Sequence, residues 1–179
     1  MTWTFSEQVA SILKASGWNA GRHVSVESIE AAVQRAFGLS PSRIVHAFMS
    51  EFSGICLKTL RDGSLVENDC FNPLQGARLI EYVFTAPSRY QDLCALSRGP
   101  LYPIGTHANM SCILMRDDGA VFSLDDLLTW FAFWGKTPEE AIEQACSPRY
   151  EIAGVGLSDD SLAVHPSELL RFEKLRDSW

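Results

Sequence analysis

The sequence predicts an α+β domain in which helices pack on a mostly antiparallel sheet. Three observations support this class. Apolar residues recur at helical spacing in the first third of the chain, short apolar stretches alternate with turn residues in the middle, and a capped helix begins near residue 138. The expected order is therefore helices, then strands in hairpins, then a closing helix.

Three helices are expected in the first third, each beginning at a serine that can cap its N-terminus. Two of them end at a glycine, which readily adopts the left-handed backbone that closes a helix. The starting serines are Ser6, Ser25 and Ser40, and the closing glycines are Gly17 and Gly38. Another helix is expected at 89–96.

The pattern changes after Gly54, where short apolar stretches replace the helical spacing. Residues 55–60 and 65–71 flank Asp62-Gly63, a dipeptide that favours the tight turn of a β-hairpin. Residues 101–105 contain proline and end in glycine, which is typical of a short strand followed by a turn. These stretches are expected to form the first part of the sheet.

The clearest hairpin lies further along the chain. Residues 111–115 and 120–123 flank Asp117-Asp118-Gly119. Two other segments remain open, because short apolar stretches do not distinguish helix from strand. Residues 76–84 fit either a helix or a strand, and residues 127–134 fit a buried strand or a short helix.

The closing helix has the strongest start signal in the sequence. Thr137-Pro138-Glu139-Glu140 forms a capping box with proline at the first helical position, and the helix is expected to continue through Ala145. We place one domain at residues 1–147. Residues 148–179 are expected to form a C-terminal extension with a short helix near 167–175.

The chain is acidic, with 22 Asp and Glu against 15 Lys and Arg and a formal net charge of −7. An acidic surface repels phosphate backbones, so direct binding of nucleic acid is disfavoured. The same surface attracts basic proteins, including nucleic-acid enzymes with basic active sites. The alternative is that the charge serves solubility alone.

The cysteines predict a reducing compartment. There are five, an odd number, with no C-x-x-C and no Cys/His cluster at zinc spacing; they are Cys56, Cys70, Cys94, Cys112 and Cys146. We expect free buried thiols, no disulfide, no metal and no cofactor. The N-terminus lacks the pattern of a signal peptide, and no apolar stretch approaches the ~20 residues of a membrane helix. A soluble cytoplasmic protein is therefore expected.

No catalytic motif is recognisable, so the protein is not expected to be an enzyme. The sequence has no phosphate-binding loop, no nucleophile elbow and no zinc-deaminase signature. His107 and Cys112 are close enough in sequence to consider as a nucleophilic pair. Because Cys112 falls in an apolar strand, a buried inert thiol is the preferred interpretation.

Five residues are candidates for binding a partner protein. Asp117 and Asp118 lie at a hairpin tip and Asp125 and Asp126 follow the returning strand, so they can project from the sheet. The alternative is that they form turns or cap a helix. Trp134 belongs to an aromatic run in which strand alternation places it on the same face as Trp130. If that face is open, the pair can anchor an interface; if it is covered, both are core.

Several segments, in order, resemble the SUKH-3 immunity protein family. They are Leu13–Trp18 with Gly21–Val24 (a "GW, then GR" opening), Phe48–Gly54, Leu101–Gly105, the hairpin Ile113–Val121, and Trp134-Gly135 with Glu140–Ile142. Ser53 stands where this family usually has glycine. The resemblance extends from about residue 6 to residue 146.

This resemblance implies a SUKH fold and a role in neutralising a toxin of a polymorphic or contact-dependent system. Toxins of these systems are commonly nucleases or nucleic-acid deaminases, so the expected partner is a cognate protein toxin, without direct binding of nucleic acid or membrane. The alternative function is an intracellular adaptor or regulatory scaffold of the wider SUKH superfamily. The identity of the toxin is not implied.

Overall fold

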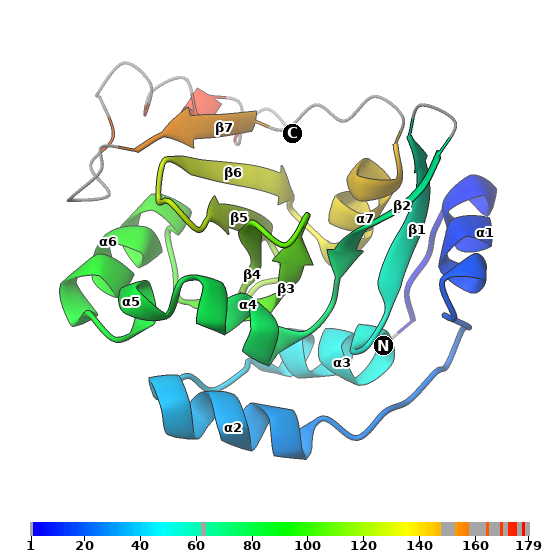
Figure 1. The fold of residues 1–179 in the computed structure, drawn as a ribbon, viewed down its shortest axis with the longest axis horizontal. Coiled ribbons are helices and arrows are strands. Elements are labelled where there is room, and N and C mark those ends of the chain that lie inside the picture. The colour runs from blue at the N-terminus through cyan, green and yellow to red at the C-terminus, as the bar shows by residue number, and fades with distance from the viewer. Residues whose placement is uncertain are drawn as a thin grey trace.

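A single antiparallel sheet organises the protein (Figure 1). The computed structural model describes residues 2–61, 64–147 and 153–157, and positions 164, 169, 172–174 and 177. Within them the sheet has seven strands, and the spatial order of the strands follows the chain. The strands are β1 (Cys56–Arg61), β2 (Ser64–Cys70), β3 (Leu101–His107), β4 (Ser111–Arg116), β5 (Val121–Asp125), β6 (Trp130–Gly135) and β7 (Ala153–Gly156). The predicted α+β class is confirmed.

Helices cover both faces of the sheet. They are α1 (Glu7–Ala15), α2 (Glu27–Phe37), α3 (Arg43–Phe52), α4 (Pro73–Leu79), α5 (Glu81–Phe84), α6 (Pro87–Ser97) and α7 (Pro138–Cys146). One core contains side chains of α1, α2, α3 and α7, and a second contains side chains of α4, α5 and α6. Strand β6 alternates between them, since Ala132 and Trp134 join the first core while Phe131 and Phe133 join the second.

Two of the predicted helix starts were correct. Ser6 caps α1 by accepting a hydrogen bond from the Val9 amide at 3.3 Å, and Thr137 caps α7. The predicted helix starts at Ser25 and Ser40 were wrong. Helix α2 follows Val26, which makes no side-chain cap bond, and α3 is capped by Ser42.

Both predicted hairpins are present as antiparallel pairs, β1 with β2 and β4 with β5. The expected turn at Asp62-Gly63 lies outside the described residues. Of the two open segments, 76–84 is helical, and most of 127–134 is strand β6, which was one of the two interpretations left open. The predicted strand at 101–105 is part of β3.

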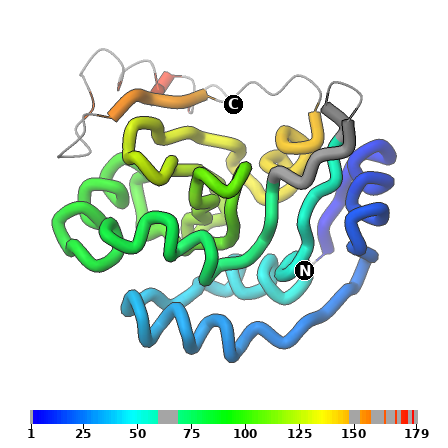
Figure 2. The backbone as a smooth tube through the Cα atoms, viewed as in Figure 1, coloured from blue at the N-terminus to red at the C-terminus, as the bar shows by residue number. Residues whose placement is uncertain are grey.

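Two of the segments that carry the family resemblance hold each other in place. After α1 the chain runs in an extended connector along the outside of the domain to α2 (Figure 2). From this connector the indole of Trp18 donates to the Glu51 carboxylate at 3.1 Å, and the Arg22 guanidinium donates to the carbonyl oxygens of Glu51 and Ser53. These side chains bind the end of α3, so both segments have a structural function.

The expectation of five free thiols is wrong for Cys56 and Cys70, which form a disulfide between β1 and β2. The two residues are 14 positions apart in sequence, but the hairpin places them directly opposite each other, with their Cα atoms 4.0 Å apart. Cys94, Cys112 and Cys146 are free. The cysteines therefore no longer argue for a reducing compartment.

The described part of residues 148–179 packs on the domain. Strand β7 lies in the predicted C-terminal extension, before the expected short helix, and it pairs with β6. Phe172 is buried, and its ring lies 5.9 Å from that of Phe131. Positions 169 and 172–174 are helical, within the region where a helix was expected. The domain boundary at 147 remains a prediction. Among the described residues, no helix is long and apolar enough to cross a membrane.

Candidate partner-binding surface

Two turns lie side by side at one end of the sheet. One joins β3 to β4 and the other joins β5 to β6, and the pairing of Ser111 with Asp125 brings them together. The Asp126 amide donates to the Met110 carbonyl oxygen at 2.8 Å, so the turns are joined by their backbones. The hydroxyl of Tyr82, from α5, donates to the Asp126 carbonyl oxygen. Helix α5 and both turns therefore form one continuous edge.

A single carboxylate organises the β5–β6 turn. Asp125 Oδ1 accepts hydrogen bonds from the amides of Thr129 and Trp130, both at 2.7 Å, and Oδ2 accepts one from the Thr129 hydroxyl at 2.5 Å. Bonds of this charged kind are stronger than neutral ones. They fix a backbone in which Leu128 has a φ of +54° and is buried while Leu127 points outward.

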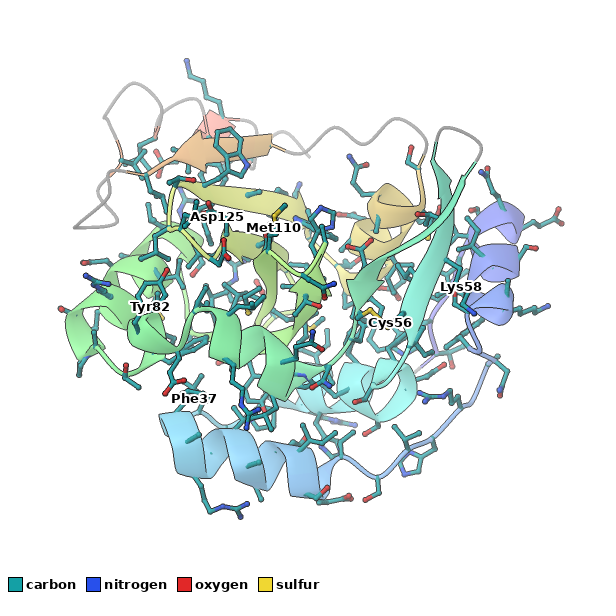
Figure 3. The ribbon with its side chains drawn as sticks, viewed as in Figure 1. Phe37, Cys56, Lys58, Tyr82, Met110 and Asp125 are labelled. Atoms are coloured by element: carbon teal, nitrogen blue, oxygen red, sulfur yellow. A yellow bond between two sulfur atoms is a disulfide. The ribbon has the colours of Figure 1, made fainter. Side chains whose placement is uncertain are left out.

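Large apolar side chains are exposed around this edge. In the described part of the chain they are Leu127 (73% exposed), Met110 (61%), Trp130 (47%) and Tyr82 (37%). Figure 3 shows Tyr82, Met110 and Asp125 on the same side of the molecule. Together with Asp125 and Asp126, these four residues are called here the loop-edge surface. Grouped apolar exposure of this kind marks interaction sites, because soluble proteins usually scatter such residues singly.

The β3–β4 turn is also well defined. Ala108 and Asn109, its central residues, have φ values of +51° and +56°, and the Met110 amide donates to the His107 carbonyl oxygen at 3.0 Å. This is the type I′ geometry that matches the twist of a hairpin. It holds Met110 at the point where the turn rejoins the sheet.

The predicted acidic residues do not form one cluster. Asp117 and Asp118 lie in the β4–β5 turn, at the other end of β5, and this five-residue strand spans roughly 17 Å. Asp118 accepts two hydrogen bonds from Arg116, at 2.6 and 2.8 Å, which lower the pKa of its carboxyl below the ordinary value. Asp117 is exposed, and its carbonyl oxygen accepts a hydrogen bond from Ser42.

Trp134 lies in the core rather than at the surface. It is 3% exposed, and its indole donates to the Ser123 hydroxyl at 2.9 Å. It forms part of the wall of a cavity of about 540 Å³ between α1 and α7, which is also lined by Glu139, Glu140 and Glu143. Because β7 and the helices cover the sheet, Trp130 is the member of the predicted pair that reaches solvent.

His107 and Cys112 do not form a nucleophilic pair. Cys112 belongs to the second core, and burial raises the pKa of its thiol well above the ordinary value. The His107 ring lies on the opposite face of the sheet, edge-on to Trp134 and 2.7 Å from the Asp69 carboxylate. This His–Asp contact joins β2 to β3, which are paired over two residue pairs. No local sequence pattern indicates this structural function.

Metal-binding chemistry is not evident in the described residues, where no group of three or more His, Cys, Asp or Glu side chains is placed to hold a metal ion. The features that stand out are the rigid turns and the apolar and acidic side chains they expose. These features suit a protein-binding domain.

A family model described as SUKH-3 immunity protein matches residues 5–147. This match covers most of the chain, so the chain belongs to the SUKH-3 immunity protein family, as the sequence motifs predicted. A search of curated proteins found no match, and neither did a search of solved structures.

Proposed function

We propose that this protein is a cytoplasmic immunity protein that binds and neutralises a cognate toxin of a polymorphic or contact-dependent system. The observation that carries the proposal is the family match over residues 5–147. The partner toxin is a domain that acts on nucleic acid, such as a nuclease or a deaminase. The net charge of −7 supports this choice, because enzymes that bind phosphate backbones have basic clefts.

Neutralisation by binding requires no chemistry from the immunity protein. The two buried free thiols fit a non-catalytic function, because burial raises the pKa of Cys146 to about 12 and that of Cys112 well above its ordinary value. A protonated thiol is a poor nucleophile. The acidic surface contributes long-range attraction, which speeds association with a basic partner.

The proposal is tested by co-expression with the toxin domain encoded beside this protein's gene. Cells that carry the toxin alone are expected to stop growing, and cells that also carry this protein are expected to grow normally. The purified pair should form a stable complex that lacks nuclease or deaminase activity. Failure to protect against any adjacent toxin would contradict the proposal and favour an adaptor function.

A further inference from the structure

We propose that the toxin docks on the loop-edge surface and receives Leu127 and Met110 in an apolar depression bordered by basic side chains. This inference rests on the proposed function, and it identifies the face and the chemistry of the partner. The contact centres on the β5–β6 turn, with Trp130 and Tyr82 beside it and Asp126 facing the basic border.

The shape of the surface determines the shape of the partner. Leu127 and Met110 are the most exposed large apolar side chains of the described residues, and both belong to turns that project from the end of the sheet. Projecting side chains are buried by a concave partner. The active-site cleft of an enzyme that binds nucleic acid is concave and basic, so docking there also blocks the entry of substrate.

The turns are already rigid before binding. The three bonds to Asp125, the bond between Asp126 and Met110 and the Tyr82 bond fix the backbone that presents Leu127. A surface fixed in advance loses little conformational entropy on binding, so more of the contact energy appears as affinity.

The charges at the two ends of the sheet favour the loop-edge surface as the docking face for a basic partner. At the loop edge, Asp125 and Asp126 lie close enough to Tyr82 that their negative charges raise the pKa of its hydroxyl, after the larger effect of burial. The Arg89 guanidinium lies over the Tyr82 ring at 5.6 Å. At the opposite end of the sheet Arg98, Arg116 and Lys136 line one cavity with Asp118 and Asp177, and the two arginines form ion pairs with these two acids. A basic partner therefore meets more cations at that end than at the loop edge.

The experiment compares matched substitutions at the two ends, using the purified full chain and the purified toxin domain. Asp126→Lys and Asp117→Lys make the same charge change, one on the loop-edge surface and one at the far end of β5. Leu127→Ala removes the apolar projection. Each variant is first checked for an unchanged melting temperature, which the exposure of Leu127 and Asp117 leads us to expect.

Binding kinetics then give the answer. Leu127→Ala is expected to weaken affinity about tenfold or more, mainly through faster dissociation. Asp126→Lys is expected to slow association about tenfold at low salt and less at high salt. Asp117→Lys should change the association rate by less than about threefold.

The outcomes separate this inference from the proposed function. If the wild-type protein binds the toxin and both loop-edge variants bind equally well, the docking face is wrong while the immunity function stands. If the wild-type protein binds no toxin, the proposed immunity function and the proposed docking face are both wrong. If sedimentation shows that the isolated protein dimerises and that Leu127→Ala abolishes the dimer, the surface is an interface between copies and this inference is overturned.

Discussion

The carboxylate of Asp125 and the backbone amide of Trp130 are joined by a 2.7 Å hydrogen bond that closes the β5–β6 turn. From the sequence, Asp125 was a candidate for binding the partner protein through its negative charge. In the structure it accepts three hydrogen bonds from its own turn. The alternative weighed for it, that paired acids form turns, describes its local function. Charge reversal at Asp125 therefore disturbs the turn as well as the charge, and Asp126 is the better residue for testing electrostatics.

We predict that Asp125→Ala destabilises the protein by about 1–3 kcal/mol, because the turn loses an ionised acceptor of hydrogen bonds. Urea denaturation followed by circular dichroism measures the change. Asp117→Ala is the matched control, since the side chain of Asp117 is exposed and its backbone carbonyl is retained. Equal stability of the two variants would contradict this function of Asp125.

Thr137→Ala is predicted to cost about 0.5–2 kcal/mol. The Thr137 hydroxyl accepts a hydrogen bond from the Glu140 amide at 3.2 Å, and alanine offers no acceptor at this helix start. Thr137→Ser retains the hydroxyl and should behave like the wild type in the same thermal or chemical denaturation. A Thr137→Ala protein that melts at the wild-type temperature would show that this cap contributes nothing.

The disulfide predicts a thiol count. Protein purified without reductant and then denatured should react at Cys94, Cys112 and Cys146 alone. Reduction should lower stability by up to about 3 kcal/mol, the entropic contribution of a closed loop of this size, and Cys70→Ser should reproduce that loss. Cys94→Ser, which removes a half-buried free thiol, is the control. Five reactive thiols in the non-reduced protein would disprove the pairing.

The Arg116–Asp118 contact predicts a pH dependence. Because the pKa of Asp118 is lower in the folded protein than its ordinary value of about 3.9, the contact adds stability above that pH and loses it as pH falls through the folded pKa. Carboxyl NMR titration should show the depressed pKa. Substitution Arg116→Gln should raise it toward the ordinary value; an unchanged titration would remove Arg116 as the cause.

Local sequence signals predicted those parts of the fold that depend on neighbouring residues. The caps at Ser6 and Thr137, the hairpin at Asp117–Gly119 and the alternation along β6 each need a few adjacent positions. The incorrect helix starts at Ser25 and Ser40 show that a serine is a cap only if the backbone after it turns helical, and here that happens one or two residues later.

Other features depended on contacts that sequence spacing does not reveal. The pairing of Cys56 with Cys70 requires the register of β1 on β2, and the strand character of Ala153–Gly156 comes from pairing with β6. Leu127 and Leu128 are identical in type, and the backbone fixed by Asp125 makes one exposed and the other buried. From the sequence alone, the exposed Leu127 therefore could not be distinguished from the core residues around it.

The sequential order of the strands bears on how the protein is made. Each strand pairs with the one that precedes it in the chain, so every hairpin can form as soon as it leaves the ribosome, without waiting for a distant segment. Among the described residues, the contacts that depend on the end of the chain are the pairing of β7 with β6, the packing of Val164 and Phe172 on the second core, and the ion pairs of Arg98 with Glu173 and Asp177. A protein whose strands pair in this order can fold early in its synthesis. This suits an immunity protein, which must be folded before the toxin acts.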